Sequence, residues 1–148
     1  MPDYELELQS LFMDTIGGLK TSMKNTMKGN GLTLSPLYFM ILKQIHETEN
    51  CTANYLADTT GRDKGQVTRL VQEVMNQELV IKCPNPNDKR SQFLLLTDKG
   101  LNLYHQLAAA DLAILKGMRA NVSDDELQIF LKIGTKMLNN LDAINSPK

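Results

Sequence analysis

In the first long stretch of the chain, apolar residues recur every three or four positions, which is the spacing of a helix. Between residues 4 and 28 the apolar positions form one stripe, which consists of Leu8, Leu11, Phe12, Ile16, Leu19, Met23 and Met27. This spacing predicts a long amphipathic helix. Gly17 and Gly18 weaken it by about 1 kcal/mol each relative to alanine, so we expect a bend or a close helix contact there. The segment Gly29-Asn30-Gly31 is predicted to end the helix.

Two shorter helices are predicted next. Ser35 followed by Pro36 combines a capping side chain with proline at the first helical position. The segment LYFMILKQIHE that follows is apolar on nearly every side, which indicates a buried helix. Thr52 can then cap the segment ANYLADTT, in which we expect Tyr55 and Leu56 to point inward.

A further helix and a hairpin follow Gly61, which closes the preceding helix. Asp63 caps the segment KGQVTRLVQEVMNQE, and Gln66 stands three residues later at a capping-box spacing. The apolar residues of this segment recur at i, i+3, i+4 and i+7, and they are Val67, Leu70, Val71 and Val74. The remaining faces of the predicted helix are polar. The runs LVIKC and SQFLLL are typical of two short strands around a Pro-Asn-Pro-Asn turn.

Two helices complete the chain. Thr97 caps one that extends to about Arg119, and Ser123 with Glu126 forms a capping box for the last. The last helix carries its own apolar stripe, Leu127, Phe130, Leu131, Ile133, Leu138 and Leu141. Both terminal helices need a surface against which to bury these stripes, and a second copy in a two-fold dimer would supply it. The predicted fold class is mainly α with a small β-hairpin, in a single domain of 148 residues.

The composition is that of a soluble protein, with 42% hydrophobic and 22% charged residues. The apolar runs are shorter than the ~20 residues of a membrane helix, and the acidic start is unlike a secretory signal. We therefore expect a cytoplasmic protein without a membrane partner. The net charge is −1, yet residues 61–90 carry six bases against four acids. Such a local basic excess suits a partner that meets only one face of the protein.

Catalytic and metal chemistry find no support in the sequence. His46 and His105 stand alone, and there is no HExxH motif, glycine-rich phosphate loop or nucleophile elbow. Cys51 and Cys83 are too few for a disulfide framework or a zinc ribbon, so we interpret them as packing residues. We expect no enzyme activity, no cofactor and no metal.

The two helices on either side of Gly61 have the proportions of a helix-turn-helix. A major groove admits one α-helix, which offers base edges the residues of its first turns. Gln bonds adenine and Arg bonds guanine, whereas Lys and Thr also reach phosphate. We therefore expect Gln66, Thr68 and Arg69 to read bases and Lys64 to contact phosphate.

A hairpin placed directly after such a helix is typical of the wing of a winged helix-turn-helix. Its tip contains Asp88, Lys89 and Arg90. We expect the Asp88 carboxylate to hold the Arg90 guanidinium through charge-assisted hydrogen bonds. An ordered arginine would enter a narrow minor groove, where the negative potential is deepest.

With these elements in place, residues 32–100 resemble the DNA-binding core of the MarR family of bacterial transcriptional regulators. The resemblance rests on the segments LTLSPLYFMILKQI, TANYLADTTG, QVTRLV and, most specifically, NPNDKRSQFLLLTDKG. It implies a homodimer assembled through residues 1–31 and 101–148, with one winged helix in each subunit. One position departs from the family pattern, because Glu78 stands where glycine is usual before the first wing strand. Asn76 is therefore expected to end the helix earlier.

The resemblance also implies a small-molecule effector, often aromatic or anionic, that binds between the dimer helices and the winged helix and releases DNA. Residues that could line its pocket are Phe12, Met13, Ile16, Tyr38, Ile41 and His46. The predicted function is thus a dimeric repressor of a pseudo-palindromic operator. Two alternatives stay open: a winged helix that binds DNA or protein without a small ligand, and a redox-responsive regulator that uses Cys83.

Overall fold

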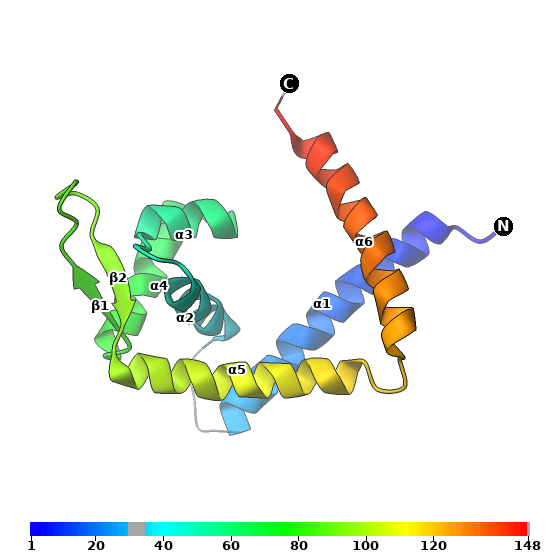
Figure 1. Cartoon of the computed structure of the whole chain (residues 1–148), viewed down its shortest axis with the longest axis horizontal. Helices are drawn as coiled ribbons and strands as arrows, with labels where there is room; N and C mark the ends of the chain where they lie inside the picture. The colour runs from blue at the N-terminus through cyan, green and yellow to red at the C-terminus, as the bar shows by residue number, and fades with distance from the viewer. Residues whose placement is uncertain (30–34, 148) are drawn as a thin grey trace. The chain divides into compact units, whose positions relative to one another are not determined.

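The computed structural model describes residues 1–29 and 35–147. Figure 1 shows helices throughout, with one short hairpin between α4 and α5. The chain divides into two compact units, Met1–Ile114 and Leu115–Lys148, and each is described here by itself. Among the helices in the described ranges, none is long and apolar enough to cross a membrane.

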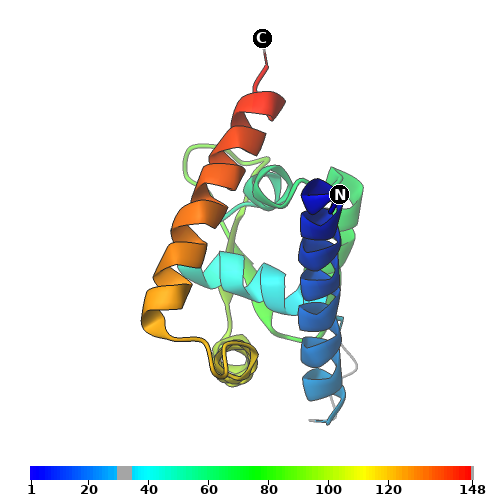
Figure 2. The same ribbon diagram turned by 90° about the vertical axis from the view of Figure 1, so that its right-hand side faces the viewer.

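Helix α1 (Tyr4–Gly29) confirms the long amphipathic helix predicted at the N-terminus. It is continuous through Gly17 and Gly18, and a Cβ atom at either glycine would meet nothing within 4 Å. The close contact expected at these glycines is therefore not made within the first unit. The helix ends at Gly29 as predicted, while Asn30 and Gly31 lie outside the described residues. Figure 2 shows one end of α2 meeting α1, and Met23 and Met27 in the C-terminal half of α1 are buried.

Helices α2 (Pro36–Glu47) and α3 (Ala53–Thr60) begin at their predicted caps. The Ser35 hydroxyl accepts the Leu37 amide at 3.2 Å, and the Thr52 hydroxyl accepts the Tyr55 amide at 3.1 Å. Phe39, Ile41, Leu42 and Ile45 of α2 are buried, whereas His46 and Glu47 at its end are exposed. The inward orientation expected for Tyr55 is wrong, since its side chain is 41% exposed. Only its neighbour Leu56 reaches the core, because adjacent helical positions point about 100° apart.

Helix α4 (Lys64–Asn76) starts at Asp63, whose carboxylate accepts the amide of Gly65 at 3.1 Å rather than that of Gln66. The cap is thus confirmed, but the capping-box arrangement expected from Gln66 is not formed. The four residues of the predicted apolar face are all buried, and they are Val67, Leu70, Val71 and Val74.

The end of α4 explains the unusual residue before the hairpin. The last helical residue is Asn76, as predicted, yet Glu78 itself adopts the left-handed conformation with φ 64°. Its amide donates to the Met75 carbonyl at 2.9 Å, and the Leu79 amide donates to the Val74 carbonyl at 3.0 Å. These two bonds form a Schellman motif, which usually places glycine at the left-handed position. The chain keeps this geometry with glutamate in its place.

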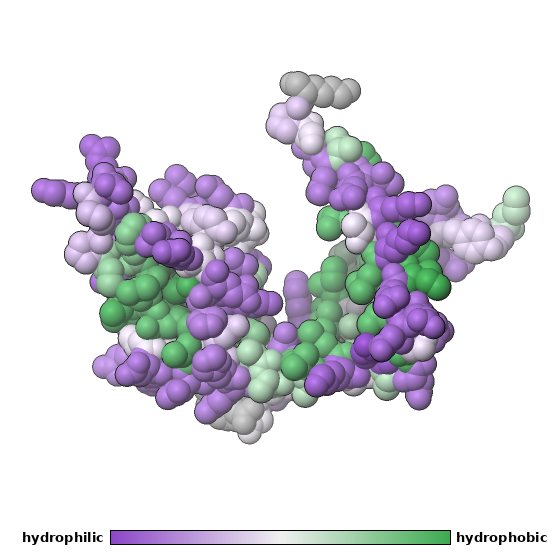
Figure 3. All heavy atoms as spheres, viewed as in Figure 1, coloured by the Kyte–Doolittle hydropathy of each residue, from purple (hydrophilic) through white to green (hydrophobic). Residues whose placement is uncertain are grey.

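The hairpin consists of β1 (Val80–Cys83) and β2 (Phe93–Leu96), which pair antiparallel with Val80 opposite Leu96. The Leu94 amide also donates to the Cys51 carbonyl at 2.8 Å, which ties the hairpin to the start of α3. Val80 and Leu94 are buried on the inner face. Ile81 and Leu95 form an exposed apolar pair on the outer face. Figure 3 shows hydrophobic surface, in green, on the side of the molecule where the hairpin lies.

Helix α5 (Asp98–Met118) is joined to the end of α4 by the Thr97-x-x-Gly100 sequence. The Thr97 hydroxyl accepts the Gly100 amide at 3.0 Å and donates to the Glu78 carbonyl at 2.6 Å. A Cβ atom on Gly100 would lie 2.0 Å from the Leu79 carbonyl oxygen. This part of the motif is therefore explained by packing between α5 and the α4–β1 turn. It requires no DNA contact.

The second unit consists of the last residues of α5 and helix α6 (Asp124–Asn145). Ser123 and Glu126 form the predicted capping box, and Arg119 makes an ion pair with Asp124 at 2.6 Å. The hydrogen bonds from Ser123 lower the pKa of the Glu126 carboxyl. Most of the predicted apolar stripe of α6 is exposed in the single chain: Phe130, Leu131, Ile133, Leu138 and Leu141.

Candidate nucleic-acid interface

The turn between α3 and α4 orients α4 with one face inward and one face outward. It comprises Gly61, Arg62 and Asp63, and Gly61 has a left-handed backbone with φ 66°. A left-handed residue reverses the chain direction at the end of a helix, and glycine does so without steric cost. The apolar face of α4 is then buried against the core, which leaves its polar face in solvent.

All four residues predicted on the recognition helix lie on exposed positions of α4. They are Lys64, Gln66, Thr68 and Arg69. Two further polar residues, Gln72 and Asn76, extend this exposed surface and are joined by a hydrogen bond of 2.9 Å from Nε2 to Oδ1. Sequence reasoning missed this pair, although their spacing of three and seven residues from Arg69 places them on the same helical face.

The tip of the hairpin is ordered by hydrogen bonds within the turn. The Asn85 side chain accepts the Asn87 amide, and the Asp88 carboxylate accepts the backbone amide of Arg90, both at 2.9 Å. The predicted pairing of Asp88 with the Arg90 guanidinium is therefore wrong. A nearby backbone amide competes for the carboxylate and costs less side-chain entropy to hold. Asp88 thus shapes the turn and leaves the guanidinium of Arg90 exposed.

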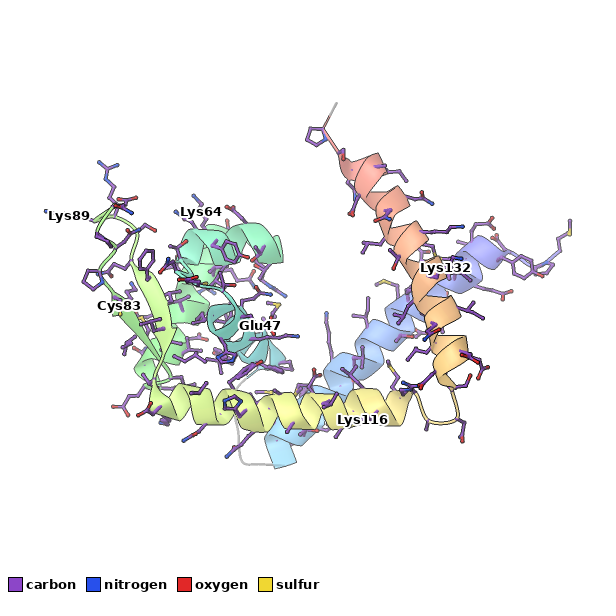
Figure 4. The ribbon with its side chains drawn as sticks, in the orientation of Figure 1. Glu47, Lys64, Cys83, Lys89, Lys116 and Lys132 are labelled. Atoms are coloured by element: carbon purple, nitrogen blue, oxygen red, sulfur yellow. The ribbon has the colours of Figure 1, made fainter. Side chains whose placement is uncertain are left out.

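The basic residues of α4 and of the hairpin tip face a common side of the first unit. Figure 4 shows Lys89 at the tip and Lys64 at the start of α4, both toward the upper edge of the view. Lys64, Lys89 and Arg90 are all exposed. This surface therefore combines positive charge with the polar face of α4.

A cavity of about 130 Å³ lies between the start of α3 and the hairpin. Its lining is basic and polar, and includes Asn54, Lys82, Arg90, Ser91 and Gln92. Of these only Arg90 was predicted as a site residue. Lys82 was not predicted as a site residue, because in the sequence it is an ordinary polar residue of a short strand. Only the fold brings it beside the start of α3.

The six residues predicted to line an effector pocket occupy three different environments. Phe12, Met13 and Ile16 are exposed on α1, whereas Ile41 is fully buried in the core. His46 is exposed and stacks on Tyr104 with ring centroids 4.4 Å apart. Tyr38 is half-buried and hydrogen-bonded to Glu73. Their role in binding an effector stays a prediction.

The two cysteines are free and differ in exposure. Cys51 is buried, and burial raises its pKa to about 11. Cys83 lies half-buried on β1. Cys51 therefore remains a thiol at neutral pH, and its environment is that of a packing residue.

A helix-turn-helix with an exposed polar second helix, followed by a hairpin, defines a winged-helix protein. Residues 30–91 match the model of the MarR family. The chain is 24% identical over 96 residues to the transcriptional regulator MhqR of Bacillus subtilis, covering 65% of this chain and 66% of that protein. It is 34% identical over 64 residues to the regulator BilQ of Clostridioides difficile, covering 43% of each. In both cases the match covers less than two thirds of the relative's length.

The fold agrees with these matches. A mutant MarR from E. coli, solved in complex with operator DNA, superimposes with a TM-score of 0.79 at 20% identity, over 92% of this chain and 96% of that one. The chain therefore has a winged-helix fold, and its residues 30–91 are similar to the MarR family. The named relatives are transcriptional regulators, which agrees with the expectation that this chain is not an enzyme.

Proposed function

We propose that the protein is a sequence-specific regulator of transcription that binds double-stranded DNA as a homodimer in the cytoplasm. The observation that carries this proposal is the division of α4 into a buried apolar face and an exposed polar face beside a basic hairpin. An α-helix of this kind fits the major groove. The regulators it resembles, and the related structure complexed with operator DNA, support the same reading.

Each element of the surface has a distinct role in this proposal. Gln66 and Arg69 read base edges in the major groove, since Gln pairs with adenine and Arg with guanine. Thr68 lies with them in the groove, and Lys64 contacts the phosphate backbone. Lys89 and Arg90 lie along the adjacent minor groove, and Asp88 keeps the tip in the required conformation through the Arg90 amide.

The dimer is proposed from the apolar stripes that each unit leaves exposed. Leu11 and Ile16 on α1 are 53% and 47% exposed, and Phe130 and Leu131 on α6 are 54% and 59% exposed. Solvent-exposed rows of this kind mark association surfaces. Residues 1–31 and 101–148 therefore serve dimerisation, and residues 32–100 form the DNA-binding core. A two-fold dimer requires a pseudo-palindromic site with half-sites about one helical turn apart.

We further infer repression that is relieved by a small aromatic or anionic effector. The candidates for its pocket are Phe12, Met13 and Ile16 of α1 together with Tyr38, Ile41 and His46 of α2. Repression follows if the operator overlaps a promoter, because a bound dimer then blocks access of the transcription machinery.

The experiment that tests the function is a selection of duplexes from a random library, followed by titration of the winner and of a scrambled duplex at several salt concentrations. An inverted repeat that binds far more tightly than the scrambled duplex is the expected result. Arg90→Ala should weaken operator binding by about 1–3 kcal/mol. Lys116→Ala, which removes the same charge outside the winged helix, is the matched control and should leave the affinity nearly unchanged.

Two outcomes would point to the alternatives. Binding that follows salt but not sequence would leave only electrostatic attraction. An absence of DNA binding by the folded protein would favour a winged helix that recognises another protein.

A further inference from the structure

One side-chain hydrogen bond in the first unit connects α4 to a different helix. The Tyr38 hydroxyl on α2 donates to the Glu73 carboxylate on α4, across 35 positions of sequence. Most other side-chain hydrogen bonds in the described ranges stay within one turn of their own element. Both residues are half-buried, and the Tyr38 side chain also packs against the edge of the core.

Glu73 places a negative charge on the helix that is proposed to contact DNA. It lies four positions after Arg69 and seven after Gln66, so all three share one side of α4. A DNA duplex carries one negative charge per ~1.7 Å of axis. A carboxylate free to turn toward the groove would therefore be repelled by phosphates and by the acceptor atoms of purines.

The hydrogen bond turns the carboxylate toward the protein. A phenol donating to a carboxylate forms a charge-assisted bond, which is stronger than a bond between neutral groups. Its anchor, Tyr38, sits near the start of α2, whose following residues Phe39, Ile41 and Leu42 are buried. Since α2 is held in the core, the phenol is a fixed donor against which the Glu73 side chain is restrained.

We propose that Tyr38 is a positioning residue that holds the Glu73 carboxylate against α2, away from the DNA that α4 contacts. The inference rests on the proposed function, because it assigns a role only on a DNA-binding α4. It assigns to Tyr38 a task in operator affinity that does not involve touching DNA or an effector.

The test is a double-mutant cycle on operator affinity at low salt. Tyr38→Phe removes the donor and frees the carboxylate, and we expect about fivefold weaker binding, as for one unit charge a few Å from a phosphate in a water-like dielectric. Glu73→Gln removes the charge and should bind at least as tightly as the parent. The combination of both should recover parent affinity, because no carboxylate is left to restrain.

A purely structural bond gives a different pattern. If Tyr38 served only to fix α4 on α2, both single variants and the double variant would lose affinity together, and the inference would be overturned. The fivefold loss should also shrink as salt is raised, because screening weakens charge repulsion. Tyr104→Phe is the matched control: it also deletes a phenol oxygen from the core, but no hydrogen bond of that oxygen is seen among the described residues.

The two proposals fail in separable ways. The parent is first titrated with the selected duplex and its scrambled control. Absence of specific binding there overturns the proposed function and this inference with it. Specific binding by the parent with unchanged affinity for Tyr38→Phe, while circular dichroism shows a folded protein, overturns only the role of Tyr38. Should Tyr38→Phe fold poorly, weaker operator binding by Glu73→Gln alone would contradict the inference.

Discussion

Replacing Glu78 with glycine is predicted to stabilise the protein. Glu78 has φ 64° and closes α4 with the two backbone bonds of a Schellman motif. A residue with a Cβ atom pays roughly 1–2 kcal/mol for a left-handed backbone, and glycine does not. Glycine costs roughly 0.4–1 kcal/mol in added unfolded-chain entropy. The difference leaves a net gain of about 1 kcal/mol in the free energy of unfolding.

The magnitude can be attributed to the backbone because the side chain of Glu78 is exposed and its carbonyl bond to Thr97 survives the substitution. Urea unfolding monitored by circular dichroism, at one fixed protein concentration, measures the difference. Glu78→Ala separates the side chain from the backbone, since it keeps the Cβ atom and should change stability little. Gln77→Gly, at φ −89°, should instead destabilise the protein by roughly 0.5–1 kcal/mol.

The reasoning would be refuted if Glu78→Gly and Glu78→Ala were equally stable. That result would mean that the left-handed backbone carries no penalty at this turn, and the departure from the glycine usual at this position would have no thermodynamic consequence.

Three further predictions concern Gly100, Lys64 and Cys51. Gly100→Ala should cost several kcal/mol or prevent folding, because its Cβ would lie 2.0 Å from the Leu79 carbonyl oxygen; Gly117→Ala, where nothing lies within 4 Å, is the control in the same thermal melt. Lys64→Ala should lower affinity similarly for operator and scrambled duplexes and reduce the salt slope by about 1, whereas a loss confined to the operator would show that Lys64 reads bases. Cys51 should react far more slowly than Cys83 with a thiol reagent at pH 8, because its pKa of about 11 leaves little thiolate; its labelling should rise as the pH approaches that value, and equal rates at pH 8 would contradict its burial.

Local chemistry made much of the fold predictable from the sequence. Ser35, Thr52, Asp63 and Ser123 start their helices as predicted, because a cap depends only on a side-chain oxygen and the next few amides. The apolar periodicity of α4 also identified its buried face correctly, because helical geometry alone decides which positions share a side. The polar recognition face of α4 follows as the remainder of that pattern.

Other features were decided only in three dimensions. The left-handed backbone of Glu78 is imposed by the α4–β1 turn, and the need for glycine at position 100 comes from the approach of α5 to the Leu79 carbonyl. Lys82 joins Arg90 at the start of α3 because the hairpin folds back on that helix. These contacts join residues distant in sequence, and no local pattern encodes the distance between them.

The hydrogen-bond partners of polar side chains were also decided only by the tertiary structure. The sequence indicated that Asp88 had a nearby donor, but only the turn geometry selected the Arg90 amide over its guanidinium. The Tyr38 hydroxyl finds Glu73 across 35 positions because α2 and α4 pack in one core. Periodicity and capping determined which elements this protein forms, whereas the packing of those elements decided which polar groups meet, because that choice depends on distances that only the tertiary structure sets.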